Sequence, residues 1–342
     1  MLFKGDSLDN LLGDILRSLI RSGRRIRAGK GKARELTGVL IELTQPTARF
    51  STTESRGHLF SFLGETLWYL SVSDRLKHIE YYIPRYRQFI SASRHCVRAP
   101  GAYGPRLFGG GDNSQIARLI GTLKAKQGLS DTRQAVAQIF LQTDLRAGNG
   151  DVPCTTTIQF LPRAEKLHLA VTMRSNDAYR GFPADVFAFT FIQELVARAL
   201  GLQIGVYSHF VGSLHLYEND QEGARAYLNE GHQYTDAMPD MPTGDPFAAL
   251  QRLLAIEEAI RLDQTEPLIT DLADYWLDLA RLLKIKALFD KKDRRQLVQV
   301  KNQMHSSVYE NFLRGRQQAL DRHPDVQPLL PGISSTAAGA PR

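Results

Sequence analysis

The sequence predicts an α+β fold, in which a mixed sheet packs against helices and a helical C-terminal extension follows. Three observations predict this class. Strand patterns recur between residues 38 and 217 without the regular strand–helix alternation of a doubly wound sheet. A strongly apolar helical pattern lies among them, at residues 184–200. Beyond a segment rich in proline, aspartate and glycine at residues 237–246, the pattern is helical only.

The N-terminal half is expected to contain three helices and one strand. Leucine and isoleucine recur at helical spacing over residues 8–20, which predicts the first helix. This helix is expected to pack and to be followed by a solvated loop over the basic run at residues 21–32; the alternative is that the helix and the basic residues after it lie on a membrane surface. GVLIEL at residues 38–43 predicts a strand, and FSFLGETLWYL within residues 58–71 predicts a helix. Residues 114–126 predict another helix.

The second half supplies most of the predicted sheet. Strands are expected at residues 135–141, 155–160, 166–173 and 205–217. The apolar helix at residues 184–200 is expected to end at Gly201, which can adopt the left-handed conformation of a helix C-terminus. We therefore expect a catalytic domain over residues 1–236 that includes the N-terminal helix. A helical extension over residues 237–330 and a disordered tail over residues 331–342 follow.

Composition narrows the class of protein. The chain has 342 residues, 43% of them hydrophobic, so it can bury a large core. A net charge of +7 favours anionic ligands, but the basic residues are spread along the chain, so nucleic-acid binding is not expected. With two cysteines, no secretory signal pattern and no apolar run long enough to span a bilayer, we expect a reduced, cytoplasmic setting and no membrane association.

The sequence contains no motif for binding metals or nucleoside triphosphates. The glycine run at residues 109–111 lacks the GK[ST] of a P-loop, and neither HExxH nor CxxC occurs. His168 and His209 have no metal-ligand spacing and are interpreted as strand residues on a half-polar face. We therefore expect no metal site. Of the two cysteines, Cys96 matches no motif and Cys154 is the candidate reactive thiol.

Three segments in the middle of the chain carry the candidate chemistry. They are VPCTTTIQF at residues 152–160, MRSNDAYRGFPADVF at residues 173–187 and SHFVGSLHLY at residues 208–217. Upstream lie GETLWYL at residues 64–70, AYG at residues 102–104, and Thr132 followed by Arg133. In this order they resemble the thymidylate synthase family over about residues 30–220. The shared pattern is Pro-Cys before a strand ending in Gln-Phe, Arg-Ser-x-Asp, a Gly and a Pro before an apolar helix, and Gly followed by His-x-Tyr.

The resemblance implies a role for each matching residue. Cys154 would be the nucleophile that adds to C6 of a pyrimidine ring, which requires a thiol made acidic by nearby cations. A buried strand cysteine is the alternative. Glu65 would be a general acid/base. The remaining implied residues are Tyr103 in catalysis; Arg34, Arg133, Arg174, Ser175, His215 and Tyr217 in nucleotide binding; and Asp177, Gly181 and Glu80 in folate binding.

The resemblance also implies partners. 5,10-Methylenetetrahydrofolate would be the co-substrate, and a homodimer would share its active sites, with Arg133 reaching into the partner's site. The family usually has a second arginine where this chain has Thr132. Arg34 would replace an arginine of a flexible loop.

Departures from the family pattern concern the base and the product. Asp185 stands where thymidylate synthases have asparagine, and deoxycytidylate hydroxymethylases resemble this sequence in having aspartate there. A carboxyl group can accept from the cytosine amino group and share a proton with ring N3. The alternative is that Asp185 caps a helix starting at Val186. The segment HIEYYIPRY at residues 78–86 lacks the family's tryptophan near Glu80 and Tyr81, and neither Trp68 nor Trp276 replaces it.

These departures predict hydroxymethylation of C5 in a cytidine monophosphate, CMP or dCMP, because water would reach the methylene intermediate. A divergent thymidylate synthase or deoxyuridylate hydroxymethylase is the alternative among enzymes. A non-catalytic nucleotide-binding regulator and RNA binding by the basic N-terminal region are alternatives from other classes. The C-terminal extension replaces the short apolar tail of thymidylate synthases, and its role stays open between covering folate, supporting the dimer and binding a partner.

Overall fold

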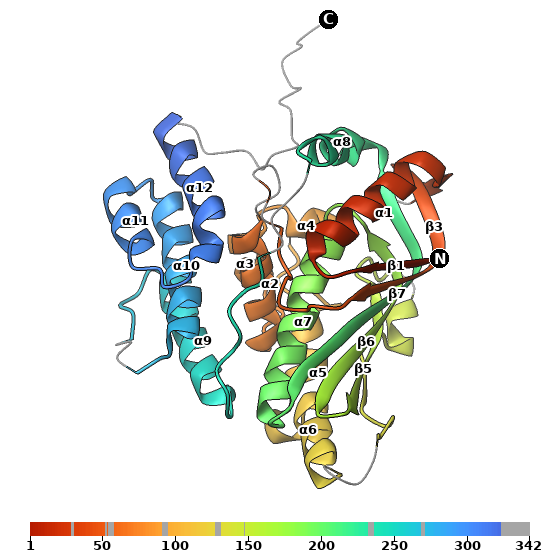
Figure 1. The fold of residues 1–342 in the computed structure, drawn as a ribbon, viewed down its shortest axis with the longest axis horizontal. Helices are drawn as coiled ribbons and strands as arrows, with labels where there is room; N and C mark the ends of the chain where they lie inside the picture. The colour runs from red at the N-terminus through yellow and green to blue at the C-terminus, as the bar shows by residue number, and fades with distance from the viewer. Residues whose placement is uncertain are drawn as a thin grey trace, which may run out of the picture.

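The computed structural model describes residues 1–28, 31–51, 53, 58–90, 95–126, 131–146, 148–231, 236–267 and 271–322. Within these residues a seven-stranded mixed sheet packs against helices, which confirms the predicted α+β class. Figure 1 shows three layers: the sheet, then α7 and α2, then the C-terminal helices α9 to α12. The tail expected over residues 331–342 lies outside the described residues.

The sheet combines parallel and antiparallel pairs. Its order is β1-β3-β7-β6-β5-β4, and β2 pairs with β3. β3 runs antiparallel to β7 and β5 antiparallel to β6, whereas β6 and β7 are parallel and are joined through α7. The strands are β1 (Leu2–Gly5), β2 (Arg24–Ala28), β3 (Gly31–Leu43), β4 (Val136–Gln138), β5 (Thr155–Arg163), β6 (Lys166–Asp177) and β7 (Gln203–Tyr217).

Helices cover the sheet and continue beyond it. Those of the first part are α1 (Leu8–Ser22), α2 (Leu59–Leu70), α3 (Leu76–Tyr82), α4 (Tyr86–Phe89), α5 (Tyr103–Phe108), α6 (Gln115–Ala125), α7 (Gly181–Ala199) and α8 (Gln221–Asn229). The C-terminal helices are α9 (Phe247–Arg261), α10 (Asp274–Asp290), α11 (Arg294–Lys301) and α12 (Glu310–Arg322). None of the helices in the described ranges is both long and apolar enough to cross a membrane.

The central helix α7 forms where the apolar run predicted it, and it starts earlier than expected. It begins at Gly181 and is buried at nearly every position from Val186 to Ala197. After its C-cap Leu200, Gly201 has a φ of 68°, the left-handed conformation expected for it. The helix is therefore enclosed by the sheet on one side and α2 on the other, as Figure 1 shows.

Three predicted features differ from the structure. The basic run expected as a solvated loop at residues 21–32 is regular where the structure describes it: residues 21–22 end α1, residues 24–28 form β2 and residues 31–32 begin β3, with Arg25 opposite Arg34 and Arg27 opposite Lys32. Long basic side chains hide the period-two pattern, because their apolar stems and charged ends suit either face of an edge strand. The strand expected at residues 135–141 is only Val136–Gln138. β1 carries only four residues and was not expected.

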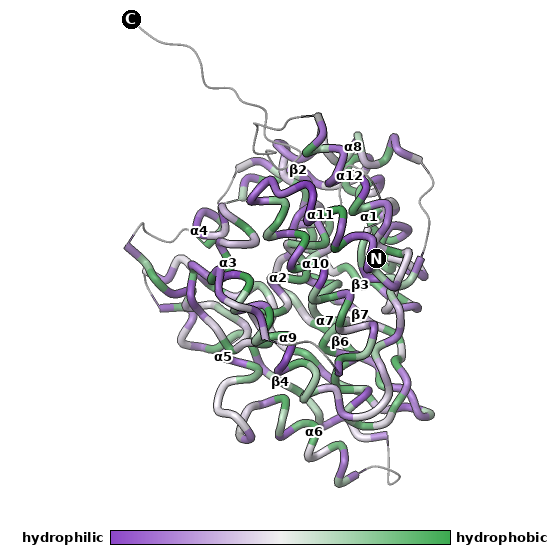
Figure 2. Tube along the Cα trace, turned by 90° about the vertical axis from the view of Figure 1, so that its left-hand side faces the viewer, coloured by the Kyte–Doolittle hydropathy of each residue, from purple (hydrophilic) through white to green (hydrophobic). Residues whose placement is uncertain are grey.

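The C-terminal helices pack directly onto the layer that carries the candidate site. The Phe312 ring meets the Phe60 ring of α2 edge-on at 4.8 Å, and Trp276 of α10 lies 6.4 Å from Phe191 of α7. Glu257 of α9 accepts a hydrogen bond of 2.8 Å from the Tyr82 hydroxyl. Figure 2, which looks onto this layer, shows hydrophobic and hydrophilic residues alternating along α11 and α12, as expected for helices with one buried face.

Gly64 of α2 is required by the packing of Tyr82. A Cβ atom at residue 64 would lie 2.1 Å from Cγ of the Tyr82 ring, so Gly64→Ala forces the buried ring away. We expect this substitution to lower the free energy of unfolding by about 1–3 kcal/mol, measured by urea denaturation. Gly121→Ala in α6 is the matched control, since nothing lies within 4 Å of its Cβ position. It should raise stability by roughly 0.5–1 kcal/mol, and equal losses in both variants would contradict the packing argument.

Candidate active site

Cys154 lies immediately before β5, where backbone and guanidinium contacts of Arg174 hold the chain. The Arg174 amide donates to the Cys154 carbonyl at 2.8 Å. The Arg174 side chain donates from Nε to the Pro153 carbonyl at 2.9 Å and from Nη2 to the Val152 carbonyl at 2.8 Å. The half-buried thiol therefore follows a segment that a guanidinium group fixes from the neighbouring strand.

Tyr103 joins this nucleophile segment to the helical layer. Its hydroxyl oxygen accepts hydrogen bonds from the Thr155 amide at 3.2 Å and the Thr155 hydroxyl at 3.1 Å. Burial raises the pKa of Tyr103 well above its usual value, and the nearby Asp185 and Cys154 raise it further. The phenol therefore stays protonated and can donate a hydrogen bond into the space between these two residues.

Glu65 faces the site from α2. The Tyr69 hydroxyl, one turn further along the helix, donates to Glu65 Oε1 at 2.8 Å. Burial raises the pKa of Glu65 from 4.5 to about 7, against the opposing effect of that hydrogen bond. A carboxyl group that titrates near neutrality can both give and take a proton, which suits a general acid/base.

Asp185 is an interior residue of α7 and not its cap. The helix starts at Gly181 with Arg180 as its N-cap residue, so the alternative that Asp185 caps a helix starting at Val186 is wrong. Burial raises the pKa of Asp185 well above its usual value, Glu65 and Asp177 raise it further, and a hydrogen bond with Asn176 opposes them. The neutral carboxyl form, which has one donor and acceptor oxygens, is therefore favoured.

The adjacent ends of β6 and β7 bring the remaining polar residues together. Asp177 is paired with His215 across the two strands, and the rings of His215 and Tyr217 meet edge-on at 4.8 Å. Ser175 lies opposite Ser213 in the same register. This places the His-x-Tyr residues beside the Arg-Ser-x-Asp segment.

The Asp177 side chain holds the turn between β6 and α7. Its Oδ1 accepts from the Tyr179 amide at 2.8 Å and the Arg180 amide at 3.0 Å, and so shapes the turn that leads into α7. Burial raises its pKa, while the Arg180 amide and His215 act in the other direction. Its expected contact with folate stays a prediction, as does that of Gly181, the first residue of α7.

Arg34 is placed away from these groups. It lies within β3 and not in a flexible loop, and it is paired with Leu216, whereas its neighbour Glu35 is paired with His215. Because directly paired residues project from the same face of a sheet, Arg34 points to the face opposite His215. Its Nη1 donates to the Gly23 carbonyl at 3.3 Å, at the end of α1.

Two further predicted residues are Arg133, which lies shortly before the edge strand β4, and Glu80, which lies on α3. Arg133 is exposed, and its backbone carbonyl accepts from the Gln159 side chain at 2.8 Å. Glu80 of α3 forms an ion pair with Arg87 at 3.0 Å. An exposed Arg133 leaves its guanidinium group available to a second subunit, and Glu80 is already compensated by a cation.

The sequence motifs did not indicate three buried residues near Asp185, namely Asn176, Tyr207 and His209. His209 was interpreted as lying on a half-polar face, but its side chain is fully buried and contacts Tyr207 and Asn176. Asn176 is the variable position of the Arg-Ser-x-Asp motif, so the motif gave no signal for it. The alternation of Tyr207, His209 and Val211 on one face of β7 was the available signal, since all three are buried.

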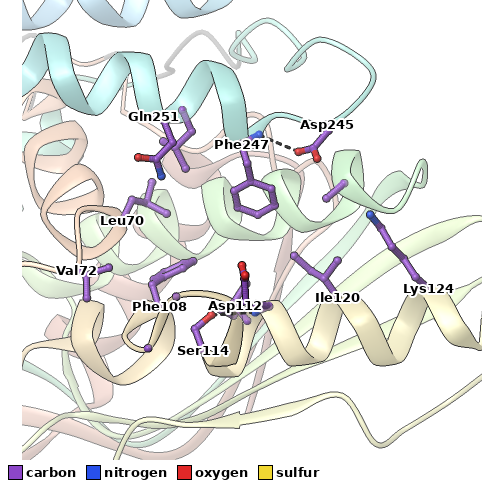
Figure 3. A pocket seen from close by; sticks show the side chains of 16 residues that line it. Leu70, Val72, Phe108, Asp112, Ser114, Ile120, Lys124, Asp245, Phe247 and Gln251 are labelled. Carbon is purple, nitrogen blue, oxygen red and sulfur yellow. Dashed lines mark hydrogen bonds between the residues drawn. The ribbon is translucent and has the colours of Figure 1, made fainter.

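A cavity of about 560 Å³ lies elsewhere, between α6 and the start of α9. Figure 3 shows Phe247 facing Ile120 and Phe108 across it, with Asp112 and Lys124 at its rim. None of the candidate catalytic or binding residues lines it, so we do not assign the candidate chemistry to it. Within the described ranges, no cluster of histidine, cysteine, aspartate and glutamate side chains could hold a metal ion.

Comparison with known proteins agrees with this geometry. The family profile described as "Thymidylate synthase" matches residues 11–244, which is more than half of the chain. The chain belongs to the thymidylate synthase family. The resemblance noted in the sequence is thereby confirmed, and the sheet described above is the fold of this family.

Similar members of the family include phage proteins. The deoxyuridylate hydroxymethyltransferase of Bacillus phage SP01 is 31% identical over 232 residues, 64% of this chain and 59% of that protein. Its counterpart from Delftia phage PhiW-14 is 30% identical over 211 residues, 58% of this chain and 57% of that protein. A thymidylate synthase of Symbiobacterium thermophilum is 34% identical over 76 residues, 22% of this chain and 27% of that protein. The chain thus spans less than two thirds of these relatives.

The raised pKa of Glu65 predicts a loss of stability as the pH rises. Below pH 4.5 both states bind the proton; above it the unfolded state releases the proton, but the folded state keeps it until about pH 7. The free energy of unfolding should therefore fall across this window by as much as about 3 kcal/mol. Glu65→Gln should remove that fall, so the stability difference between variant and wild type grows from pH 4.5 to 7 in urea titrations. A difference independent of pH would show that Glu65 titrates normally.

Proposed function

We propose that this chain hydroxymethylates C5 of a cytidine monophosphate, ribo or deoxy, with 5,10-methylenetetrahydrofolate as the one-carbon donor. The observation that carries the proposal is the half-buried Asp185 carboxyl, which lies inside α7 near Glu65 and whose pKa is raised well above its usual value. Membership of the thymidylate synthase family supports one-carbon chemistry at a pyrimidine ring. The names of the phage relatives support hydroxymethyl as the group transferred.

In the proposed reaction the Cys154 thiolate adds to ring C6. A C–S bond forms, and the electron pair of the C5–C6 double bond becomes available at C5 to attack the methylene carbon that the folate supplies. The Arg174 guanidinium, held beside residues 152 and 153, stabilises negative charge near the thiol. After C5 loses its proton, the bond between the methylene carbon and the folate nitrogen breaks and tetrahydrofolate leaves with that electron pair. Water then adds to the exocyclic methylene carbon, and departure of the Cys154 thiolate restores the C5–C6 double bond.

In this scheme Glu65 and Tyr103 carry out the proton transfers. Glu65, with a pKa of about 7, can take the C5 proton or orient the attacking water. Tyr103 keeps its proton and is anchored on Thr155, so it can donate to a group on the ring or to the departing thiolate. Both side chains come from the helical layer, on α2 and α5; Tyr103 contacts Thr155, the residue after Cys154, and Glu65 lies near Asp185.

The nucleotide would lie along the ends of β6 and β7. Arg174 and Ser175 are suited to the phosphate, because a guanidinium and a hydroxyl donate to phosphate oxygens. His215 and Tyr217 are suited to the sugar hydroxyl groups. Arg34 projects from the other face of β3, so its position gives no support to the phosphate role expected from the sequence. Asp177 and Gly181, at the entry to α7, remain the proposed neighbours of the folate.

The fate of the methylene carbon depends on what shields it. Trp68 is fully buried against Tyr69 and Tyr86, with the Tyr86 ring edge-on at 5.2 Å, and Trp276 is buried in α10. Both indoles belong to the core, and neither is placed to cover a ring held by Cys154. This supports addition of water over reduction to a methyl group.

A uridine nucleotide is the alternative substrate. The specific observation in its favour is the printed function of the phage relatives, which are deoxyuridylate hydroxymethyltransferases. Uracil presents an acceptor at O4 and a donor at N3, the reverse of cytosine, and a neutral carboxyl can in principle satisfy either pattern. The identity of the base therefore depends on residue 185 and on the residues that orient its carboxyl group.

Substitution of Asp185 tests the base. We expect Asp185→Asn to lower kcat/KM for the cytidine nucleotide and to raise it for the uridine nucleotide. An unmatched buried hydrogen-bonding group costs on the order of 1–3 kcal/mol, which corresponds to roughly tenfold to a hundredfold in discrimination. The measurement is tritium release from 5-tritiated CMP, dCMP, UMP and dUMP, with and without methylenetetrahydrofolate. If the wild type prefers a uridine nucleotide, or the ratio does not change, the cytosine assignment is wrong.

An exposed apolar strip on the sheet supports a homodimer. Leu40 of β3 and Phe210 of β7 are directly paired, so they project from the same face, and they are 36% and 42% exposed. A second copy that covered this face would bury them. Arg133, exposed before β4, would then be available to the partner's phosphate site.

Mixing inactive variants tests the shared site. Cys154→Ser should abolish turnover while nucleotide binding persists, and Arg133→Ala should weaken turnover in its own homodimer. Heterodimers of the two should regain activity in up to about half of their sites, because one site keeps both groups. The measurement is tritium release after subunit exchange, with each variant alone as the control. A strictly monomeric chain in sedimentation, or no regain on mixing, would rule out donation of Arg133 across an interface.

A further inference from the structure

A chain of buried polar side chains leads from β7 to Asp185, and the proposed reaction does not use it. The Tyr207 hydroxyl lies 2.6 Å from Nδ1 of His209, and Nε2 of His209 lies 3.1 Å from Nδ2 of Asn176. Asn176 in turn hydrogen-bonds the Asp185 carboxyl. Tyr207 and His209 are fully buried and Asn176 is 4% exposed, so the chain is shielded from solvent.

The direction of each hydrogen bond follows from the groups involved. The amide nitrogen of Asn176 can only donate, so Nε2 of His209 must accept and therefore carries no proton. The proton of the neutral ring is then on Nδ1, from which it is donated to the Tyr207 oxygen. Burial lowers the pKa of His209 to about 3, which keeps the ring neutral. The described groups that face the ring are Tyr207, Asn176 and the edge-on Phe182 ring, all uncharged at neutral pH.

Asn176 is fixed on both sides of its amide. Its Nδ2 lies 3.1 Å from Nε2 of His209 and 3.2 Å from the sulfur of Met173, and the side chain also hydrogen-bonds the Asp185 carboxyl. On the other side, a Cβ atom at Gly181 would lie 2.8 Å from Asn176 Oδ1, so the glycine gives the amide the room it occupies. A turned amide would present its oxygen to His209 and would require the Nε2–H tautomer of the ring, and it would lose the contact between Nδ2 and the Met173 sulfur.

We propose that Tyr207, His209 and Asn176 are positioning residues that set the hydrogen-bonding pattern of Asp185 and thereby select the base. The Asp185 oxygen that accepts from Asn176 is kept as the carbonyl oxygen, and the proton stays on the other oxygen. This inference rests on the proposed function, because it assigns these residues to the recognition of the base by Asp185.

This relay of Tyr207, His209 and Asn176 matters because a neutral carboxyl group that nothing orients can carry its proton on either oxygen. With its proton on either oxygen, a neutral carboxyl could match the N3 acceptor and amino donor of cytosine, or the O4 acceptor and N3 donor of uracil. Fixing the proton on one oxygen leaves a single order of donor and acceptor. Only one of the two bases fits that order, and the proposed function makes it cytosine.

Three substitutions test the relay through the ratio of kcat/KM for cytidine and uridine nucleotides. His209→Phe and Asn176→Leu remove the acceptor and the donor, and each should reduce the ratio by about tenfold or more. His209→Gln supplies an oxygen that can accept from Asn176, and it should retain most of the ratio. A purely structural role would lower turnover of both bases equally and would not distinguish glutamine from phenylalanine at position 209.

A matched control uses a second buried histidine. His78 of α3 is 4% exposed and lies 3.3 Å from Glu257 in the C-terminal layer, outside the relay. His78→Phe should lower the melting temperature but leave the base ratio unchanged. If it changes the ratio as much as His209→Phe does, the relay has no specific role.

A spectroscopic measurement tests the relay without turnover, and so separates it from the proposed function. In ¹⁵N-histidine NMR of the whole protein, assigned by its loss in His209→Gln, His209 should appear as the neutral Nδ1–H tautomer from about pH 5 to 8. Asn176→Leu should change that signal. A ring that carries its proton on Nε2, or that titrates near its ordinary value, would overturn the relay even if the enzyme hydroxymethylates cytidine nucleotides. The expected tautomer without turnover of any of the four nucleotides would instead reject the proposed function alone.

Discussion

The burial of α7 is the constraint on which the rest of the structure depends. The helix is enclosed by the sheet and α2, so every polar side chain on it needs a partner inside the protein, since an unpaired buried polar group costs several kcal/mol. Glu194 forms an ion pair with the fully buried Arg49 and accepts a hydrogen bond of 2.7 Å from the Met241 amide. Asp185 meets this need through Asn176 and through retention of a proton. The same burial that stabilises the helix therefore creates its reactive carboxyl.

The C-terminal helices belong to this arrangement because they support the helix that carries Glu65. Glu257 of α9 binds the Tyr82 hydroxyl, and the Tyr82 ring lies against Gly64, the residue before Glu65. Arg261 donates to Glu257 at 2.8 Å; this contact and that of His78 lower the pKa of Glu257 despite its burial. The position of Glu65 is thus coupled through two contacts to a segment that is nearly 200 residues further along the chain.

Much of the candidate site was predictable from the sequence, because its residues lie in motifs with a fixed local geometry. Cys154 precedes β5 and Arg174 lies near the end of β6, and the pairing of Thr155 with Met173 brings them together. Asp185 was predicted for its chemistry and within a helix expected at residues 184–200, but the helix begins earlier, at Gly181, since helix starts are poorly marked in an apolar run. The position of Arg34 was not predictable for a similar reason: basic residues in a hairpin do not reveal which face of the sheet they occupy. Its role in nucleotide binding stays a prediction.

The sequence by itself determined the fold class, the family and the types of group that could act, because hydrophobic periodicity and ordered motifs are local properties of the chain. Only the tertiary structure decided the state of those groups. The raised pKa of Glu65, the proton held on Asp185 and the neutral ring of His209 all come from burial by segments distant in sequence. Local pattern marks which side chains are polar, but the loss of solvent that changes their chemistry depends on packing between layers.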